Sequence, residues 1–208
     1  MTKNFVSNKD ETVRMFDNDI LEAMSKVHFS VPLYIFIPII LAFLYRAVFV
    51  FASDFLSIVS MVLLGVIVWT LTEYMLHRFI FHYKPSSHFG ERIHFIFHGV
   101  HHDFPSDSKR LVMPPSVSLP LALLFYFLFL AIFGQEKVAS FMPGFLTGYL
   151  FYDMTHYAVH HFNMHSKLWL SLKNHHMKHH YQDADKGYGV SSPVWDKIIG
   201  TDFPDKGK

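Results

Sequence analysis

The sequence of 208 residues contains no cysteine. This excludes disulfide bonds, zinc–thiolate sites, iron–sulfur clusters and thiol nucleophiles, so any metal must be bound by nitrogen and oxygen. The net charge of +1 gives no sign of a basic, nucleic-acid-binding surface. No signal peptide is apparent, because charges are spread through residues 1–26 and the apolar residues begin near Val31. Residues 20–27 are predicted to form at most a short surface helix.

Hydrophobic residues, by contrast, make up 51% of the chain and include 23 phenylalanines. They gather in four segments of roughly 20 residues, the length of a membrane-spanning helix. The segments are residues 31–52, 55–76, 115–133 and 138–159. Because only residues 53–54 and 134–137 separate the members of each pair, we expect an all-α membrane protein with four transmembrane helices in two hairpins. Four buried helices of a soluble protein would fit the length, aromatic content and scarcity of charge less well.

The rest of the chain is polar and rich in histidine. We expect a single domain over residues 1–208. Its parts are a polar N-terminal segment (1–30), a first hairpin (31–76), a connector (77–114), a second hairpin (115–159) and a tail (160–208). Lysine and arginine gather in the three polar parts, and only Arg46 and Lys137 fall on the other side. The positive-inside rule therefore predicts a cytosolic helical cap formed by the connector and the tail.

Four groups of histidines lie at or just beyond the apolar segments, and histidine is costly in hydrocarbon but common at metals. Residues three and four apart share a helix face, so the members of the last three groups are predicted to project together. The first two are five apart, so either the helix ends between them or each serves a different metal. Ten imidazoles suggest two ions with four or five ligands each. The ten are His77 and His82; His98, His101 and His102; His156 and His160; and His176, His179 and His180.

Supporting residues are also apparent. Neutral imidazole suits iron, zinc, copper and nickel, so the pattern leaves open whether the site activates oxygen on iron or merely binds zinc. Glu73 lies one turn before the first group and Asp153 three residues before the third, where a carboxylate can fix the orientation and tautomer of a ligating ring. His161 and His175 flank two groups and are candidates for the same task. The alternative for all four is an ordinary polar residue.

Several stretches resemble the fatty acid hydroxylase branch of the sterol desaturase superfamily, most closely its fatty acid 2-hydroxylases. Those that carry the histidine groups are HRFIFH at 77–82, HFIFHGVHH at 94–102, GYLFYDMTHYAVHH at 148–161 and HHMKHH at 175–180. Two further stretches, RLVMPP at 110–115 and GYGV at 187–190, are more specific to this branch. The resemblance covers roughly residues 30–203 and implies a four-helix membrane anchor capped by a dimetal site.

The resemblance further implies hydroxylation at carbon 2 of a long acyl chain, that of a fatty acid or a ceramide, with molecular oxygen and two electrons. It assigns the same ten histidines as ligands of two metal ions, with iron expected for activity and zinc possible in purified protein. Near the site, polar groups must hold the substrate carbonyl. The candidates for this task are Tyr149, Tyr152, Tyr157 and Lys178.

Many relatives carry a fused cytochrome b5 domain, whereas only residues 1–30 precede the first apolar segment here. We therefore expect electrons from a separate donor protein, cytochrome b5-like or ferredoxin-like. The compact size and the lack of a visible retention signal favour a bacterial inner membrane, or the endoplasmic reticulum if the source is eukaryotic. Two alternatives stay open. One is a desaturase, or a sterol or carotenoid hydroxylase, of the same superfamily; the other is a metal transporter or a non-catalytic metal-binding membrane protein.

Overall fold

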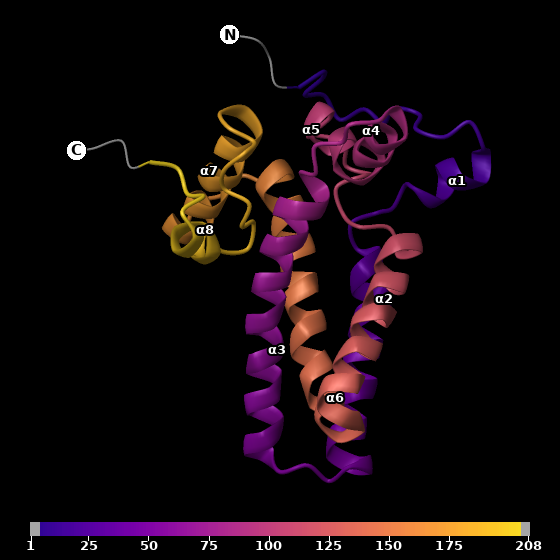
Figure 1. Ribbon diagram of the computed structural model, residues 1–208, viewed down its shortest axis with the longest axis vertical. Helices are drawn as coiled ribbons and strands as arrows, with labels where there is room; N and C mark the ends of the chain where they lie inside the picture. Colours follow the sequence, from indigo (N-terminus) through magenta and orange to yellow (C-terminus); the bar gives the residue numbers. More distant parts are fainter. Residues whose placement is uncertain (1–4, 205–208) are drawn as a thin grey trace.

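The computed structural model describes residues 5–204, and within that range every regular element is a helix (Figure 1). The all-α prediction is thereby confirmed. The elements in chain order are α1 (Asp19–Met24), α2 (Val31–Tyr45) with its π-helical end η1 (Arg46–Val50), α3 (Phe55–Met75) with its π-helical end η2 (Leu76–Phe81), α4 (His88–His94), η3 (Phe95–Gly99), α5 (Val100–Asp103), α6 (Pro115–His161), α7 (Lys167–Tyr181) and α8 (Val194–Ile199).

Three helical stretches of the described chain are long and apolar enough to cross a membrane: Val31–Val50, Phe55–Phe81 and Pro115–His161. The first two match the first two predicted segments, although the second extends five residues further, to Phe81. Asp54 explains where α3 begins, because its side chain accepts the amide of Ser57 over 3.0 Å and caps the helix. The predicted third and fourth segments are joined in the single stretch α6.

The chain nevertheless folds back within α6, at Gly134. This residue has φ 75° and ψ 174°, a conformation that interrupts the helix and favours glycine. The rings of Phe125 and Phe145 lie 5.0 Å apart between centroids, and those of Phe129 and Phe141 lie 4.5 Å apart. In a straight helix, residues 125 and 145 would be about 30 Å apart. One residue therefore makes the reversal for which the sequence suggested a four-residue connector.

The second half of α6 is the central helix of the bundle, lying between α3 and the first half of α6 in Figure 1. Two glycines bring α3 and α6 close together. A Cβ atom on Gly144 would lie 1.9 Å from the carbonyl oxygen of Val62, and one on Gly148 would lie 2.6 Å from the Cβ of Trp69. Small residues four apart allow this close backbone approach in membrane helices. The packing fixes the C-terminal end of α6, which carries the third group of histidines.

The short helices gather at one end of the bundle, which we call the cap: α4, η3, α5, α7 and α8 with the segments that join them (Figure 1). The N-terminal segment, residues 5–30, crosses the cap. The amides of Val6 and Ser7 both donate to the carbonyl of Asp103, at 2.9 and 3.1 Å. α1 is the short surface helix that the sequence allowed, and it packs beside the connector through a buried ion pair between Glu22 and Arg110.

Candidate metal centre and adjoining cavity

The ten histidines come together in two clusters of five at the junction of the cap and the bundle. Within each cluster the inward-facing nitrogens all lie within 4.8 Å of one another. The first cluster comprises His77, His82, His98, His102 and His179, and the second comprises His101, His156, His160, His176 and His180. Each cluster thus draws on three different parts of the chain, and each matches the number of ligands that the sequence suggested for one ion.

The last turn of α3 explains how His77 and His82 reach the same cluster. Here the helix widens into η2, and the amide of His82 donates to the carbonyl of His77, five residues earlier, over 3.0 Å. A π-turn takes in an extra residue, so positions five apart come onto one side. The two ring centroids lie 4.9 Å apart. Because η2 ends at Phe81, the alternative of a helix ending between the two histidines holds, but the π-turn itself was not foreseen.

The two histidine triplets do not project together as predicted. His98 and His102 belong to the first cluster, whereas His101 belongs to the second. Viewed along a helix axis, the side chains of residues four apart point in directions that differ by about 40°. The side chains of residues three apart differ by about 60° in the opposite sense. The C-terminal triplet divides in the same way: His179 joins the first cluster, and its two companions join the second. Each triplet therefore spans both clusters and fixes their separation.

Two rings of the first cluster are oriented by backbone carbonyls. The Nδ1–H of His77 donates to the carbonyl of Tyr188 over 2.5 Å, and that of His179 donates to the carbonyl of Lys186 over 2.7 Å. A carbonyl can only accept, so the proton sits on Nδ1 and the Nε2 lone pair faces the cluster. Burial lowers the pKa of His179 to about 4 and those of His98 and His101 well below the usual range, so these rings are neutral.

The nitrogen atoms themselves show that a cation fits. Seven Nε2···Nε2 separations within the clusters fall between 2.9 and 3.1 Å. The Nε2 of His98 faces three other Nε2 atoms at once, and a single proton cannot satisfy three such contacts. Nitrogen lone pairs that face one point repel one another unless a cation lies between them. Nitrogens about 2.1 Å from an ion and at right angles would lie about 3.0 Å apart, against about 3.4 Å for a tetrahedron.

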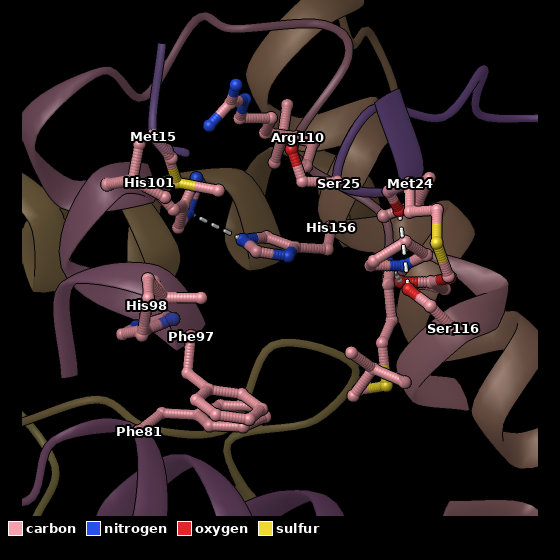
Figure 2. Close-up of a pocket in the computed structure, with 18 of the residues that line it drawn as sticks. Met15, Met24, Ser25, Phe81, Phe97, His98, His101, Arg110, Ser116 and His156 are labelled. Atoms are coloured by element: carbon pink, nitrogen blue, oxygen red, sulfur yellow. Dashed lines mark hydrogen bonds between the residues drawn. The ribbon is translucent and has the colours of Figure 1, made fainter. Parts of the chain in front are cut away.

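A cavity of about 200 Å³ adjoins both clusters, and it is lined by His98 of the first and by His101 and His156 of the second (Figure 2). Figure 2 shows Phe81 and Phe97 along one side of this space and Met24 and Ser116 along another. The wall is mostly apolar. An apolar ligand in this cavity would lie directly against the imidazoles. A smaller space of about 20 Å³ lies among α3 and both halves of α6, and Met113 lines both this space and the cavity.

Two residues predicted to hold the substrate carbonyl, Tyr149 and Tyr152, form a group at this wall with Asp153, which was predicted to orient a ligating ring. Tyr152 and Asp153 line the cavity, and the hydroxyl of Tyr149 donates to the carboxylate of Asp153 over 3.0 Å. The other carboxylate oxygen accepts the amide of Met113 over 3.2 Å. Asp153 therefore orients the cavity wall and contacts no clustered histidine. The ring of Tyr152 stacks on that of His156, with 5.8 Å between centroids.

The other predicted supporting residues lie away from the cavity. Tyr157 stacks on Phe29 with 4.5 Å between centroids, and the Nζ of Lys178 lies 5.5 Å from the centre of the Phe203 ring. Neither is among the described residues that line the cavity. His161 stacks on the outer face of Tyr157 and joins neither cluster.

Glu73 and His175 also contact no clustered imidazole directly. Glu73 accepts the amides of Val190 and Ser191, each over 2.8 Å. His175 pairs with Asp196 over 3.2 Å. Glu73 therefore holds the loop of residues 186–191, and His175 contacts Asp196, which also binds this loop.

Sequence reasoning missed the contribution of the N-terminal segment to the cavity. Met15, Leu21 and Met24 line the cavity. Arg110, which lies in the connector of residues 77–114, lines it as well. The buried Glu22 of α1 accepts Arg110 at 2.6 Å and holds α1 at this position. One signal was available, because Glu22 is the one acid among the apolar residues 20–24 of α1 and Arg110 opens the RLVMPP segment.

Comparisons with known proteins agree with this geometry. A family model described as fatty acid hydroxylase matches residues 62–201, a range that contains all ten clustered histidines. The chain is similar to a solved structure described as full-length scs7p with only its hydroxylase domain visible. The two share a TM-score of 0.85 and 34% identity, over 92% of this chain and 72% of the other.

Two of three named relatives match nearly the whole chain, and the third matches 70% of it. A fatty acid 2-hydroxylase from Rattus norvegicus is 38% identical over 93% of this chain and 58% of its own length. A dihydroceramide fatty acyl 2-hydroxylase from Arabidopsis thaliana is 36% identical over 92% of this chain and 80% of its own. A ceramide very long chain fatty acid hydroxylase from Schizosaccharomyces pombe is 42% identical over 70% of this chain and 43% of its own. The chain thus spans little more than half of the rat protein.

Proposed function

The chain belongs to the fatty acid hydroxylase family, and from that premise we propose that it is a membrane-bound dimetal monooxygenase that hydroxylates carbon 2 of long acyl chains. The observation that carries the proposal is the apolar cavity whose wall includes imidazoles of both clusters. We propose further that residues 1–208 act as a single hydroxylase domain. The substrate class is the acyl group of a fatty acid or of a ceramide-type sphingolipid.

The ten clustered histidines would hold two metal ions, five to each. A structural zinc site takes four ligands in a tetrahedron, whereas five imidazoles in each cluster would suit a metal of higher coordination number. We therefore propose iron for the active protein, with zinc able to occupy the same sites in purified material. Iron would supply the oxidant for an unactivated carbon–hydrogen bond. In the balanced reaction, oxygen, two electrons and two protons convert that bond to a carbon–hydroxyl bond and release water.

The cavity explains why the position next to the carbonyl would be the one that reacts. Burial of an acyl tail out of water contributes about 0.8 kcal/mol per methylene, so the apolar cavity can take the tail but would leave the polar head group outside. The polar head group stays toward the cap, so the first carbons of the chain lie nearest the histidines. Tyr152 has no hydrogen-bond partner for its hydroxyl among the described residues, and it lines the cavity beside His156. We propose that this hydroxyl donates to the acyl carbonyl oxygen.

The fold-back at Gly134 supports four membrane spans in two hairpins, with α2 and α3 forming the first hairpin and the two halves of α6 the second. The excess of basic residues in the cap supports a cytoplasmic location for it. The membrane would be a bacterial inner membrane, or the endoplasmic reticulum in a eukaryote. Reporter fusions at Gln135 and at Lys208 should lie on opposite sides of the membrane. The same side for both would contradict the four-span arrangement.

We propose that the two electrons come from a separate donor protein of the cytochrome b5 or ferredoxin type. Purified protein should therefore turn over only when such a donor and its reductase are added. Full activity with a chemical reductant and no donor protein would contradict the need for a specific donor.

Product analysis tests the proposed reaction. Cells with and without the gene, grown under labelled oxygen, should differ in labelled 2-hydroxy acyl chains. New double bonds would indicate a desaturase, and hydroxylated sterols or carotenoids would indicate another branch of the superfamily. Metal uptake into proteoliposomes without any change in lipids would indicate a transporter.

A further inference from the structure

The loop of residues 186–191, which we call the strap, passes beside the first histidine cluster and is held by two buried carboxylates. Asp196 in α8 accepts the amides of Tyr188 and Gly189 over 2.9 and 2.8 Å. Glu73 in α3 accepts the amides of Val190 and Ser191, each over 2.8 Å. Both acids are at least 97% buried, at 0% and 3% exposed. Four consecutive amides of the strap are therefore fixed by two side chains from different helices.

The carbonyl groups of the same strap orient two imidazoles. Those of Lys186 and Tyr188 accept the Nδ1–H groups of His179 and His77, respectively. Both of these rings belong to the first cluster. In the second cluster, the Nδ1 atoms of His176 and His180 are buried and have no hydrogen-bond partner among the described residues. The strap therefore acts on one cluster only.

Two glycines make the path of the strap possible. Gly187 has φ +70°, and a Cβ atom there would lie 2.4 Å from the ring of Phe203. A Cβ atom on Gly189 would lie 2.0 Å from the carbonyl oxygen of Ser192. A single added methyl group would thus displace the strap without removing any polar side chain. This gives a physical reason for the Gly-Tyr-Gly segment that follows the last histidine motif.

We propose that the strap sets the affinity of the first metal site alone, with Glu73 and Asp196 as positioning residues that act through it on His77 and His179. The inference rests on the proposed dimetal function. Carbonyl contacts to Nδ1 fix the ring and its tautomer, and losing such contacts weakens metal binding 10- to 100-fold in typical sites. The two sites are consequently unequal: the first is pre-organised, and the second is the one that releases its ion more readily.

Single-site backgrounds test the proposal. His180→Ala made together with His176→Ala would leave only the first site intact, and His82→Ala made together with His102→Ala only the second; these are called the His180→Ala and His82→Ala backgrounds. Each background is combined with Gly187→Ala, with Glu73→Ala and with the conservative Glu73→Gln. Detergent-solubilised full-length protein is titrated with Co²⁺ against a competing chelator, and the bound metal per chain and the Co²⁺ absorption spectrum are recorded. Thermal unfolding and gel filtration identify any variant that fails to fold.

In the His180→Ala background, Gly187→Ala and Glu73→Ala should weaken Co²⁺ binding roughly 10- to 100-fold and alter its spectrum, whereas Glu73→Gln should restore most of the affinity. In the His82→Ala background the same changes should leave affinity and spectrum unchanged. Equal weakening in both backgrounds, or no weakening in either, would overturn the role of the strap while leaving the metal sites in place. If neither background bound Co²⁺ with the native strap, the dimetal function itself would be overturned, and this inference with it.

Discussion

The buried ion pair between α1 and the connector should hold one wall of the cavity in place. Glu22 and Arg110 meet at 2.6 Å, with side chains only 6% and 2% exposed. Glu22 also accepts Lys26 at 2.7 Å and the amides of Met15 and Phe16 at 3.0 and 3.1 Å. Replacement of Glu22 by alanine would remove all four of these contacts at once and leave the buried Arg110 charge with only Asp107, 3.7 Å away, as a carboxylate partner. We predict that the N-terminal segment then detaches from the cap.

The size of the effect follows from burial and from the carboxyl pKa. Breaking a buried pair by removing one member costs about 3–5 kcal/mol. Burial alone would raise the pKa of Glu22, but Lys26, the two amides and Arg110 outweigh it and lower the pKa from 4.5 to about 2. That difference corresponds to roughly 3 kcal/mol. Since the folded-state pKa is the lower one, the stabilisation is present above about pH 4.5 and is lost as the pH falls toward 2.

Hydrogen–deuterium exchange of the detergent-solubilised protein would measure this change directly. Glu22→Ala should lower the opening free energy of residues 5–27 by about 3 kcal/mol and raise the KM for acyl substrate, with metal content unchanged. Asp19→Asn is the matched control, because its pair with Arg14 is exposed and worth at most about 1 kcal/mol. Unchanged exchange in residues 5–27, or an equal change in both variants, would refute the reasoning.

Three further predictions follow from the site and the bundle. His101→Ala and His179→Ala, one from each cluster, should abolish activity without affecting membrane insertion, whereas the exposed His165→Ala should retain activity; normal turnover in either of the first two would exclude that ring as a ligand. Gly144→Leu should prevent the packing of α3 on α6, because its Cβ would lie 1.9 Å from the carbonyl oxygen of Val62, and thermal unfolding should show the loss. Tyr152→Phe should lower kcat/KM roughly tenfold at unchanged metal content, the loss of one hydrogen bond; unaltered kinetics would remove this hydroxyl from substrate binding.

The sequence was most informative where chemistry and spacing are local. Ten histidines near the ends of apolar segments were enough to select the residues that the structure gathers into two clusters. The family resemblance, carried by the histidine motifs with RLVMPP and GYGV, is confirmed by the match over residues 62–201. Helix lengths were also close, because about 20 apolar residues is a strong signal for a spanning helix.

The division of the histidines between the clusters depended on features that regular periodicity cannot show. The π-turn brings His77 and His82, five residues apart, to one side, and the split of each triplet depends on where its helix lies relative to the two clusters. The role of Glu73 was similarly hidden: its position one turn before His77 suggested direct contact, but the carboxylate holds a loop more than a hundred residues away. The wall contributed by Met15 and α1 depends on long-range packing, which no local motif records.

Hydroxylation at carbon 2 is tested most directly with an acyl substrate that carries two deuterium atoms at that carbon. The iron-loaded protein, an electron donor and ¹⁸O₂ would be supplied together, and the product examined by mass spectrometry. The account predicts a product that has lost one of the two deuterium atoms and gained one ¹⁸O atom at carbon 2. A product that keeps both deuterium atoms and carries the label elsewhere, or one with a new double bond and no label, would contradict it.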